Sequence, residues 1–161
     1  MTDHYSNHTI KSERTLHTKR IVDGLRAKGL IDMVGLETIL FYPDLPTKQE
    51  LVEGMRFYGI PVMVTEFNVN MGRFNGAKSE KLRLQAKAYY NAVSACLESG
   101  VCKGFIMIYV SDAANFWNTQ QDLPGWSPQN DPSPFDQNFR PKPCYYAARM
   151  AILDYMRSVS K

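Results

Sequence analysis

The stretch that most constrains the fold is the apolar run from Pro61 to Asn70, which carries a single carboxylate, Glu66. Val62 to Val64 are continuously apolar, which is typical of a strand buried on both faces. Glu66 is expected where this strand emerges from the core. In a barrel of parallel strands, that rim is where strand ends converge and active sites form. Glu66 is therefore a candidate nucleophile or general base, with a structural ion pair as the alternative.

The rest of the chain alternates predicted helices and strands. Helices are expected over 12–27, from Thr47 onward, over 79–98 and over 145–156; strands are expected over 30–36, 61–70 and 104–110, with loops over 1–11, 41–46 and 119–142. Gly29 is predicted to stop the first helix, and Thr47 with Glu50 forms a capping box for the second. Strands that are apolar throughout and alternate with helices indicate parallel βαβ units. Three such strands leave two edges that must be covered.

Spacing also predicts which residues of two helices face the core. The second helix is expected to bury Leu51, Met55 and Tyr58. The last helix is expected to direct Tyr145, Ala148, Ile152 and Met156 inward.

Composition narrows the classes of function. A net charge of +3, with Lys and Arg scattered along the predicted helices, argues against a nucleic-acid partner. No apolar run approaches the roughly 20 residues of a membrane span, and the first residues show no signal-peptide pattern. The chain is expected to form a single domain over 1–161.

The cysteine spacing allows two interpretations, a disulfide or free thiols. Cys96 and Cys102 bracket the segment 97–101 and close a small disulfide loop in an oxidising compartment, or remain thiols in a reducing one. The histidines at positions 4, 8 and 17 show no metal-ligand spacing with the cysteines, so no metal site is expected.

Several motifs together resemble one known family. The stretch "GIPVMVTEFNV" resembles the seventh barrel strand of glycoside hydrolase family 10, the endo-β-1,4-xylanase family, in which the glutamate of a "TElD" motif is the nucleophile. In family order, "IDMVGLE" looks like the sixth strand, "CLESGVCKGFIMIYVSDAANFW" looks like the seventh helix and eighth strand, and "FDQNFRPKPCYYAARMAI" is similar to the closing segment. The start, "DHYSN", resembles the motif that ends the fifth strand.

The resemblance implies roles for individual residues. Glu66 matches the nucleophile, and Trp117 matches a tryptophan that covers the sugar near the cleavage point. Asp112 and Tyr5 match rim positions and are candidate sugar contacts. Cys96 and Cys102 fall where fungal members carry a short-loop disulfide.

The sequence also departs from the family pattern. Members carry a "GxQxH" pattern after the sixth strand, where this chain has Glu37 and Ile39. Ile108 replaces the eighth-strand tryptophan that stacks on the reacting sugar, with Tyr109 beside it. Losing the histidine removes a group that could orient Glu66, and a second carboxylate at Glu37 would weaken the nucleophile by like-charge repulsion. Glu37 is a candidate catalytic partner, sugar ligand or ion-pair residue, and Tyr109 is a candidate sugar ligand.

The resemblance implies an α/β fold: a partial (β/α)8 TIM barrel, approximately strands 6 to 8 with their helices. A complete barrel runs to about 250 residues, so the acid/base glutamate of the fourth strand is expected to be absent. The implied function is retaining hydrolysis of β-1,4-linked xylan once the missing half is supplied. No cofactor is implied, because paired carboxylates need only water.

Two other functional interpretations of the sequence remain open. The chain is a carbohydrate-binding or self-associating half-barrel without turnover, or it is an inactive gene fragment. The implied partners are a β-1,4-linked oligosaccharide or polysaccharide and either a second copy or the missing barrel half. The parent family implies secretion.

Overall fold

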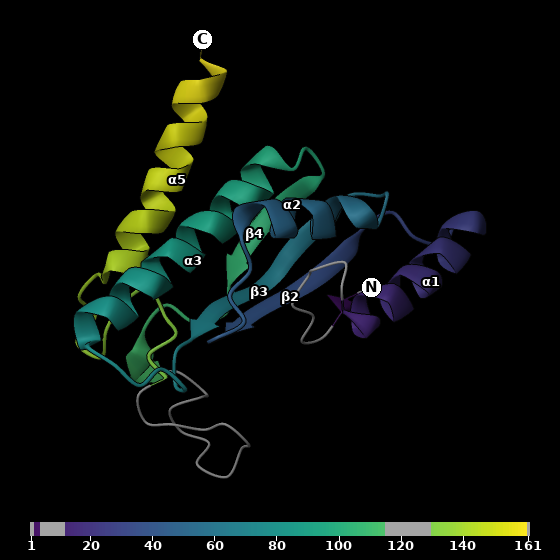
Figure 1. Cartoon of the computed structure of the whole chain (residues 1–161). Helices are drawn as coiled ribbons and strands as arrows, with labels where there is room; N and C mark the ends of the chain where they lie inside the picture. The colour runs from purple at the N-terminus through teal and green to yellow at the C-terminus, as the bar shows by residue number, and fades with distance from the viewer. Residues whose placement is uncertain (1, 4–11, 115–129, 161) are drawn as a thin grey trace.

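The computed structural model describes residues 2–3, 12–114 and 130–160, and its centre is one parallel sheet (Figure 1). The sheet has four strands in the order β1-β2-β3-β4. They span Thr2–Asp3, Val34–Phe41, Val62–Asn70 and Cys102–Met107, and every neighbouring pair is parallel. The expected parallel βαβ arrangement is therefore confirmed.

Helices connect the strands, and one further helix follows the last strand. These are α1 (Glu13–Ala27), α2 (Lys48–Phe57), α3 (Lys78–Glu98) and α5 (Pro143–Val159), with a short 3₁₀ turn at Asp112–Ala114. In Figure 1, α2 and α3 lie over the same face of the sheet, α5 runs beside α3, and α1 lies at the opposite end of the molecule from α5. Within the described part of the chain, no helix is long and apolar enough to cross a bilayer.

The core lies between the sheet and its covering helices. Strand residues Leu36, Val64 and Phe67 are fully buried. The Phe67 ring meets the rings of Tyr89 from α3 and Phe105 from β4, both with centroids 4.9 Å away. Edge-to-face and tilted aromatic pairs of this kind add to the free energy gained by burial. The core-facing side of each strand is thereby fixed, and the polar residues between these positions must point to the other side of the sheet.

The start of β2 differs from the sequence expectation. Residue Gly29 ends α1, as predicted, with a φ of +65° that suits a residue without a side chain. The Leu30 amide then donates to the Leu25 carbonyl and the Gly29 amide to the Arg26 carbonyl, which closes the helix end. Leu30 therefore belongs to the helix cap. Strand pairing begins only at Val34, so β2 lies about four residues later than expected and includes Phe41, which the sequence predicts to lie in a loop.

The outer strands also differ from expectation. Residues 2–3 pair with Gly35 and Leu36, so the sheet gains a fourth strand in a region predicted to be loop. Strand β4 ends at Met107, three residues earlier than predicted, because pairing with β3 stops after the Ile108 amide donates to the Phe67 carbonyl.

Helix α2 follows the predicted pattern. The capping box between Thr47 and Glu50 is present, and Leu51, Met55 and Tyr58 are fully buried. The side chain of each capping residue satisfies an amide that the first helical turn leaves without a partner.

Helix α5 buries Ala148, as predicted, but its buried face otherwise differs from the predicted one. Its buried residues are Cys144, Ala148 and Ala151, which lie four and three residues apart and form one stripe. Ile152 and Met156, expected to point inward, are 46% and 56% exposed. Small side chains allow α5 to approach α3 closely, and this turns the larger apolar residues away from the contact.

Candidate active site

Two carboxylates face each other across the centre of the sheet. The Cα partner of Glu66 in β3 is Glu37 in β2. Glu66 is the fifth of nine residues in its strand, so the expectation that it stands at the strand end was wrong. Pairing with β2 continues to Asn70 and carries the strand beyond it. Glu37 likewise lies inside β2 and is buried.

A β-bulge places both carboxylates on the face away from the helices. Leu36 pairs with Val64, but the next pair is Glu37 with Glu66, so Thr65 is an extra residue in β3. Without this insertion, the alternation of side chains would direct Glu66 toward the core, as it directs Val64. With it, Phe67 points to α3 and Glu66 points to the opposite face. We call that face the lumen face. It carries three cross-strand pairs, which are Glu37 with Glu66, Ile39 with Asn68, and Phe41 with Asn70.

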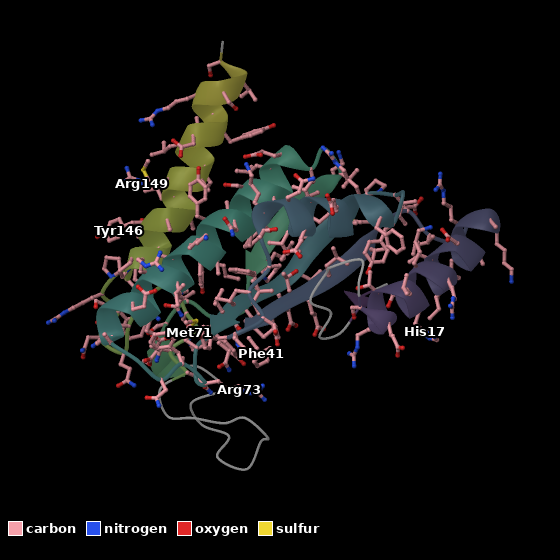
Figure 2. All side chains as sticks on the ribbon, viewed as in Figure 1. His17, Phe41, Met71, Arg73, Tyr146 and Arg149 are labelled. Carbon is pink, nitrogen blue, oxygen red and sulfur yellow. A yellow bond between two sulfur atoms is a disulfide. The ribbon has the colours of Figure 1, made fainter. Side chains whose placement is uncertain are left out.

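The lumen face continues beyond the carboxylates. Ile39 pairs with Asn68, and Phe41 pairs with Asn70, so these four side chains extend the same two rows. Figure 2 shows that Phe41 lies toward the carboxyl end of the sheet, close to where Met71 follows the last residue of β3. The lumen face thus carries two carboxylates, two amides and two apolar side chains in adjacent rows.

The amide of Asn68 is unusual. The residue is 1% exposed, and within the described part of the chain neither of its amide atoms has a hydrogen-bond partner. The Asn70 oxygen accepts from the Gly72 amide at 3.0 Å, but its nitrogen also lacks a partner there. Each buried polar group left without a hydrogen bond costs about 1–3 kcal/mol. Such groups call for an explanation, and a bound polar ligand is one. The alternation in "TEFNVN" could have revealed this row, because it places both amides on the side of Glu66.

The other predicted sugar contacts are distributed differently. Tyr109 follows the end of β4 and is half-buried. Ile108 is hydrogen-bonded to β3 through its backbone. Tyr5 and Trp117 lie outside the described residues, so their predicted roles stay predictions.

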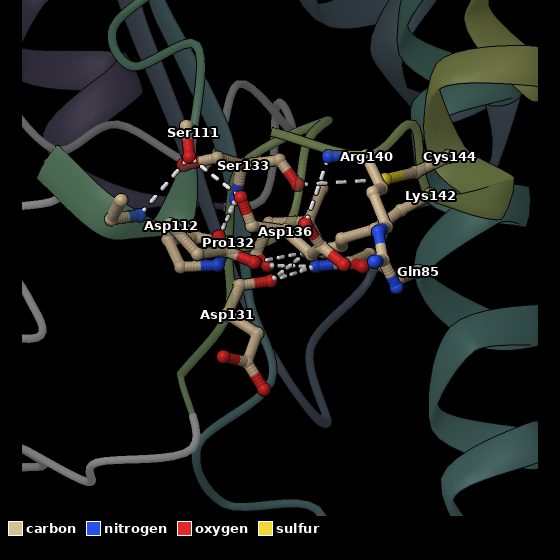
Figure 3. A network of polar contacts seen from close by, with 12 residues as sticks. Gln85, Ser111, Asp112, Asp131, Pro132, Ser133, Asp136, Arg140, Lys142 and Cys144 are labelled. Carbon is tan, nitrogen blue, oxygen red and sulfur yellow. Dashed lines mark hydrogen bonds and ion pairs between the residues drawn. The ribbon is translucent and has the colours of Figure 1, made fainter. Parts of the chain in front are cut away.

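Asp112 lies in a buried polar network, shown in Figure 3. It is 3% exposed. One carboxylate oxygen accepts from the Lys142 ammonium at 2.8 Å, and the other accepts from the Ser133 amide at 2.8 Å. Burial raises the pKa of this carboxyl above its ordinary value, and the Lys142 charge opposes that shift. The predicted sugar contact at Asp112 is not what this arrangement favours, because both oxygens already accept hydrogen bonds inside the protein.

The same network holds the segment 130–142 against the rest of the fold. The Gln85 side chain of α3 donates to the carbonyls of Val69 and Asp131, at 3.1 and 2.6 Å. The Lys142 ammonium donates to the Asp131 carbonyl at 2.7 Å, and the Tyr89 hydroxyl donates to the Pro132 carbonyl. This part of the predicted long loop therefore has a defined structure. Sequence reasoning missed the network, because its acceptors are mostly backbone carbonyls.

Cys96 and Cys102 are joined by a disulfide bond. It links the end of α3 to the first residue of β4. The Ser99 hydroxyl accepts from the amides of Val101 and Cys102, at 3.3 and 3.0 Å, and holds the intervening turn. Among the described residues, no group of three or more His, Cys, Asp or Glu side chains could hold a metal ion.

The fold and the lumen face together define a class. A parallel sheet with connecting helices on one side and carboxylates on the other is a mixed α/β arrangement of the kind found in β/α barrels. Comparison with known proteins is more specific. The profile of glycosyl hydrolase family 10 matches residues 2–151, and the chain belongs to this family.

Individual relatives agree with this assignment. The chain is similar to endo-1,4-beta-xylanase 2 of Aureobasidium pullulans, with 28% identity over 96% of this chain and 45% of that protein. A putative endo-1,4-beta-xylanase of Caldicellulosiruptor saccharolyticus is 27% identical over 84% of this chain and 46% of its own length. The chain thus spans slightly less than half the length of these relatives.

Solved structures give the same picture of the fold. Xylanase 10B of Thermotoga maritima superimposes with a TM-score of 0.81 at 19% identity, over 95% of this chain and 46% of that one. The xylanase XylE of Penicillium canescens gives a TM-score of 0.76 at 25% identity, over 86% and 42% of the two chains. The mixed α/β fold with a parallel sheet is therefore that of the family 10 barrels.

Proposed function

We propose that this chain is the part of a family 10 xylanase that supplies the nucleophile, Glu66, for cleavage of β-1,4-linked xylan. The observation that carries the proposal is the position of Glu66 at the centre of the lumen face, in a chain that belongs to this family. The substrate class is inferred from the similar proteins, which are endo-1,4-beta-xylanases. One solved relative, from Bispora, was determined with xylobiose.

In this proposal β1 to β4 correspond to the fifth to eighth strands of the barrel. Strand β3 then provides the nucleophile. A retaining glycosidase needs a second carboxyl group about 5 Å away to protonate the leaving oxygen. The family resemblance assigns that group to the fourth strand, so the reaction requires the other half of a barrel.

The neighbours of Glu66 adjust its chemistry. Glu37 replaces the glutamine of the family pattern and is the direct cross-strand neighbour of Glu66. A carboxylate at this position places a second negative charge beside the one that the nucleophile carries. We expect slower attack than in a barrel with glutamine at this position. The two amides at Asn68 and Asn70 offer donors and acceptors for sugar hydroxyls next to Glu66.

The disulfide supports a location outside the reducing cytosol. A bond between Cys96 and Cys102 persists in oxidising compartments and is rare where thiols are kept reduced. We therefore propose that the protein acts after secretion, as an enzyme that meets a plant polysaccharide would.

The test is covalent labelling with a fluorinated xyloside that carries a dinitrophenolate leaving group, which departs without protonation. The chain is incubated with this reagent alone and with the N-terminal half of a related barrel. Mass spectrometry of peptides should then find the sugar on Glu66 when the second half is present. Glu66→Gln should abolish the adduct. Glu37→Gln, the matched control on the same face, should keep the adduct and form it faster. Labelling of Glu37, or no adduct under either condition, would contradict the proposal.

A further inference from the structure

The start of α3 and the segment 131–143 enclose a groove on the side of the sheet that carries the helices. It consists of two adjoining cavities of about 310 and 380 Å³, which share Lys78, Leu82 and Asp131 as lining residues. Its walls come from α3 and from the segment that leads into α5, two helices that run side by side (Figure 1). Glu66 points to the opposite face of β3, so the sheet itself separates this groove from the lumen face.

The wall opposite α3 is held in place by hydrogen bonds inside the protein (Figure 3). The Asp131 carbonyl accepts from the Lys142 ammonium at 2.7 Å. One oxygen of the Asp136 carboxylate accepts from the amides of Asn138 and Arg140, at 2.8 and 2.9 Å. A wall that is already ordered in the free protein loses little conformational entropy when a ligand binds.

Two residues of this wall have an unfavourable backbone conformation. Among the described residues, Asp131 and Phe139 are the non-glycine residues with positive φ, at 35° and 58°. In this region the Cβ of an L-residue lies close to a carbonyl oxygen, which costs free energy. Asp131 lines both cavities, and Phe139 lies between Asn138 and Pro141, which line the larger one. Strained residues of this kind cluster where proteins bind ligands.

The larger cavity carries polar side chains that can still form hydrogen bonds. Lys78, Gln137 and Asn138 line it and are exposed, and none of these three side chains is hydrogen-bonded to another described residue. The second carboxylate oxygen of Asp136 accepts no hydrogen bond from the described residues either. An ammonium group donates, a carboxylate accepts, and an amide side chain does both. Together these groups can pair with neighbouring hydroxyls of a sugar, which also donate and accept.

The groove carries no net charge. Its ionised side chains are three lysines and three aspartates, namely Lys78, Lys81, Lys142, Asp112, Asp131 and Asp136. Lys81 pairs with Asp131 at 3.1 Å. Lys142 pairs with Asp112 at 2.8 Å. A charged ligand would gain little attraction from such a balanced surface, so the groove favours a neutral ligand that is rich in hydroxyl groups.

An aromatic ring contributes to the smaller cavity. Phe74 lines it and is half-buried. The ring is held edge-to-face against Tyr42, with the two centroids 5.2 Å apart. A ring fixed in this way offers an apolar surface on which the C–H face of a sugar can pack. We propose that this groove is a second sugar-binding site, which holds a neutral oligosaccharide chain away from the lumen face. The choice of xylan as the source of that chain rests on the proposed function.

The experiment is a titration of the isotope-labelled 161-residue chain with xylohexaose, followed by NMR. We expect the backbone amide signals of Lys78, Gln137 and Asn138 to shift with one common dissociation constant. Because neutral groups recognise the sugar, that constant should change by less than about twofold between about 50 and 500 mM NaCl. The double variant Gln137→Ala with Asn138→Ala should raise it by about tenfold or more. Both side chains are exposed, so circular dichroism should show an unchanged fold.

Gln49→Ala is the matched control. It removes an exposed amide from α2, and the adjacent Lys48 pairs with Glu98, at the opposite end of α3 from the groove. This variant should bind xylohexaose as tightly as the unchanged chain does.

Amide shifts confined to the lumen face, or no shift at the highest sugar concentration, would overturn the proposal. An unchanged dissociation constant in the double variant would overturn it too, as would tighter binding of trigalacturonate, a sugar chain that carries carboxylates. Labelling of Glu66 is measured by peptide mass on the other face of the sheet. Failure of the proposed function and failure of this inference therefore give different results.

Discussion

Breaking the ion pair between Asp112 and Lys142 should destabilise this fold more than most single substitutions. The two side chains are 2% and 8% exposed, and the nitrogen and oxygen are 2.8 Å apart. The pair connects the turn after β4 to the residue that precedes α5. Lys142→Met removes the cation but keeps most of the side-chain volume, and it leaves the Asp112 carboxylate buried without its charged partner.

The magnitude follows from the geometry. At an effective dielectric constant of about 20, two unit charges 2.8 Å apart attract each other by ~6 kcal/mol. The cost of removing both charges from water offsets much of this attraction, so the intact pair contributes little net stability. Removing one partner is different, because the remaining charge stays buried. We expect Lys142→Met to lower the free energy of unfolding by about 3–5 kcal/mol at pH 7.

The destabilisation caused by Lys142→Met should change with pH in a direction that the pKa of Asp112 determines. Burial raises the pKa of Asp112 in the folded chain above its ordinary value. A carboxyl with a raised pKa favours folding below its unfolded pKa, and that contribution is lost as pH rises through the folded pKa. In Lys142→Met no cation opposes the shift, so the loss with rising pH should be larger. The cost of the substitution should therefore shrink as pH falls through the raised pKa of Asp112, because the buried carboxyl then becomes neutral.

The assay is urea denaturation followed by circular dichroism at several pH values. The double variant Asp112→Asn with Lys142→Met should be less destabilised than the sum of the two single variants, because it buries no charge. Additive single effects, or a cost of Lys142→Met that does not change with pH, would refute the reasoning.

Three further predictions concern single sites. Asn68→Leu should raise the free energy of unfolding by about 1–2 kcal/mol, since it removes two buried amide atoms that have no hydrogen-bond partner among the described residues. It should also weaken xylobiose binding in calorimetry with the completed barrel, and a loss of stability would contradict this reasoning. Burial raises the pKa of Cys144 to about 11, so roughly one thiol in a thousand is ionised at pH 8, and alkylation should occur only after unfolding; fast native labelling would count against it. Replacing Cys96 and Cys102 by serine should lower the unfolding free energy by about 2 kcal/mol, the loop entropy of so short a ring, whereas an unchanged denaturation midpoint would argue otherwise.

Local sequence signals predicted the order of elements well. Periodicity located α2 and α3, and two end signals were correct: the capping box at Thr47 and the stop at Gly29. These features depend on residues within one or two turns of each other, so they can be read without the rest of the chain. The same signals failed at β2, where Leu30 is apolar but serves the helix cap.

The sequence by itself determined that the strands are parallel, that the family is glycoside hydrolase family 10, and that Glu66 is the candidate nucleophile. Only the tertiary structure decided which side of the sheet each residue faces. A bulge at Thr65 turns Glu66 toward the lumen face and aligns it with Glu37, and a stripe of small residues turns Ile152 and Met156 of α5 outward. Bulges and helix rotations depend on contacts between segments far apart in the chain, because each one adjusts to the shape of its neighbour.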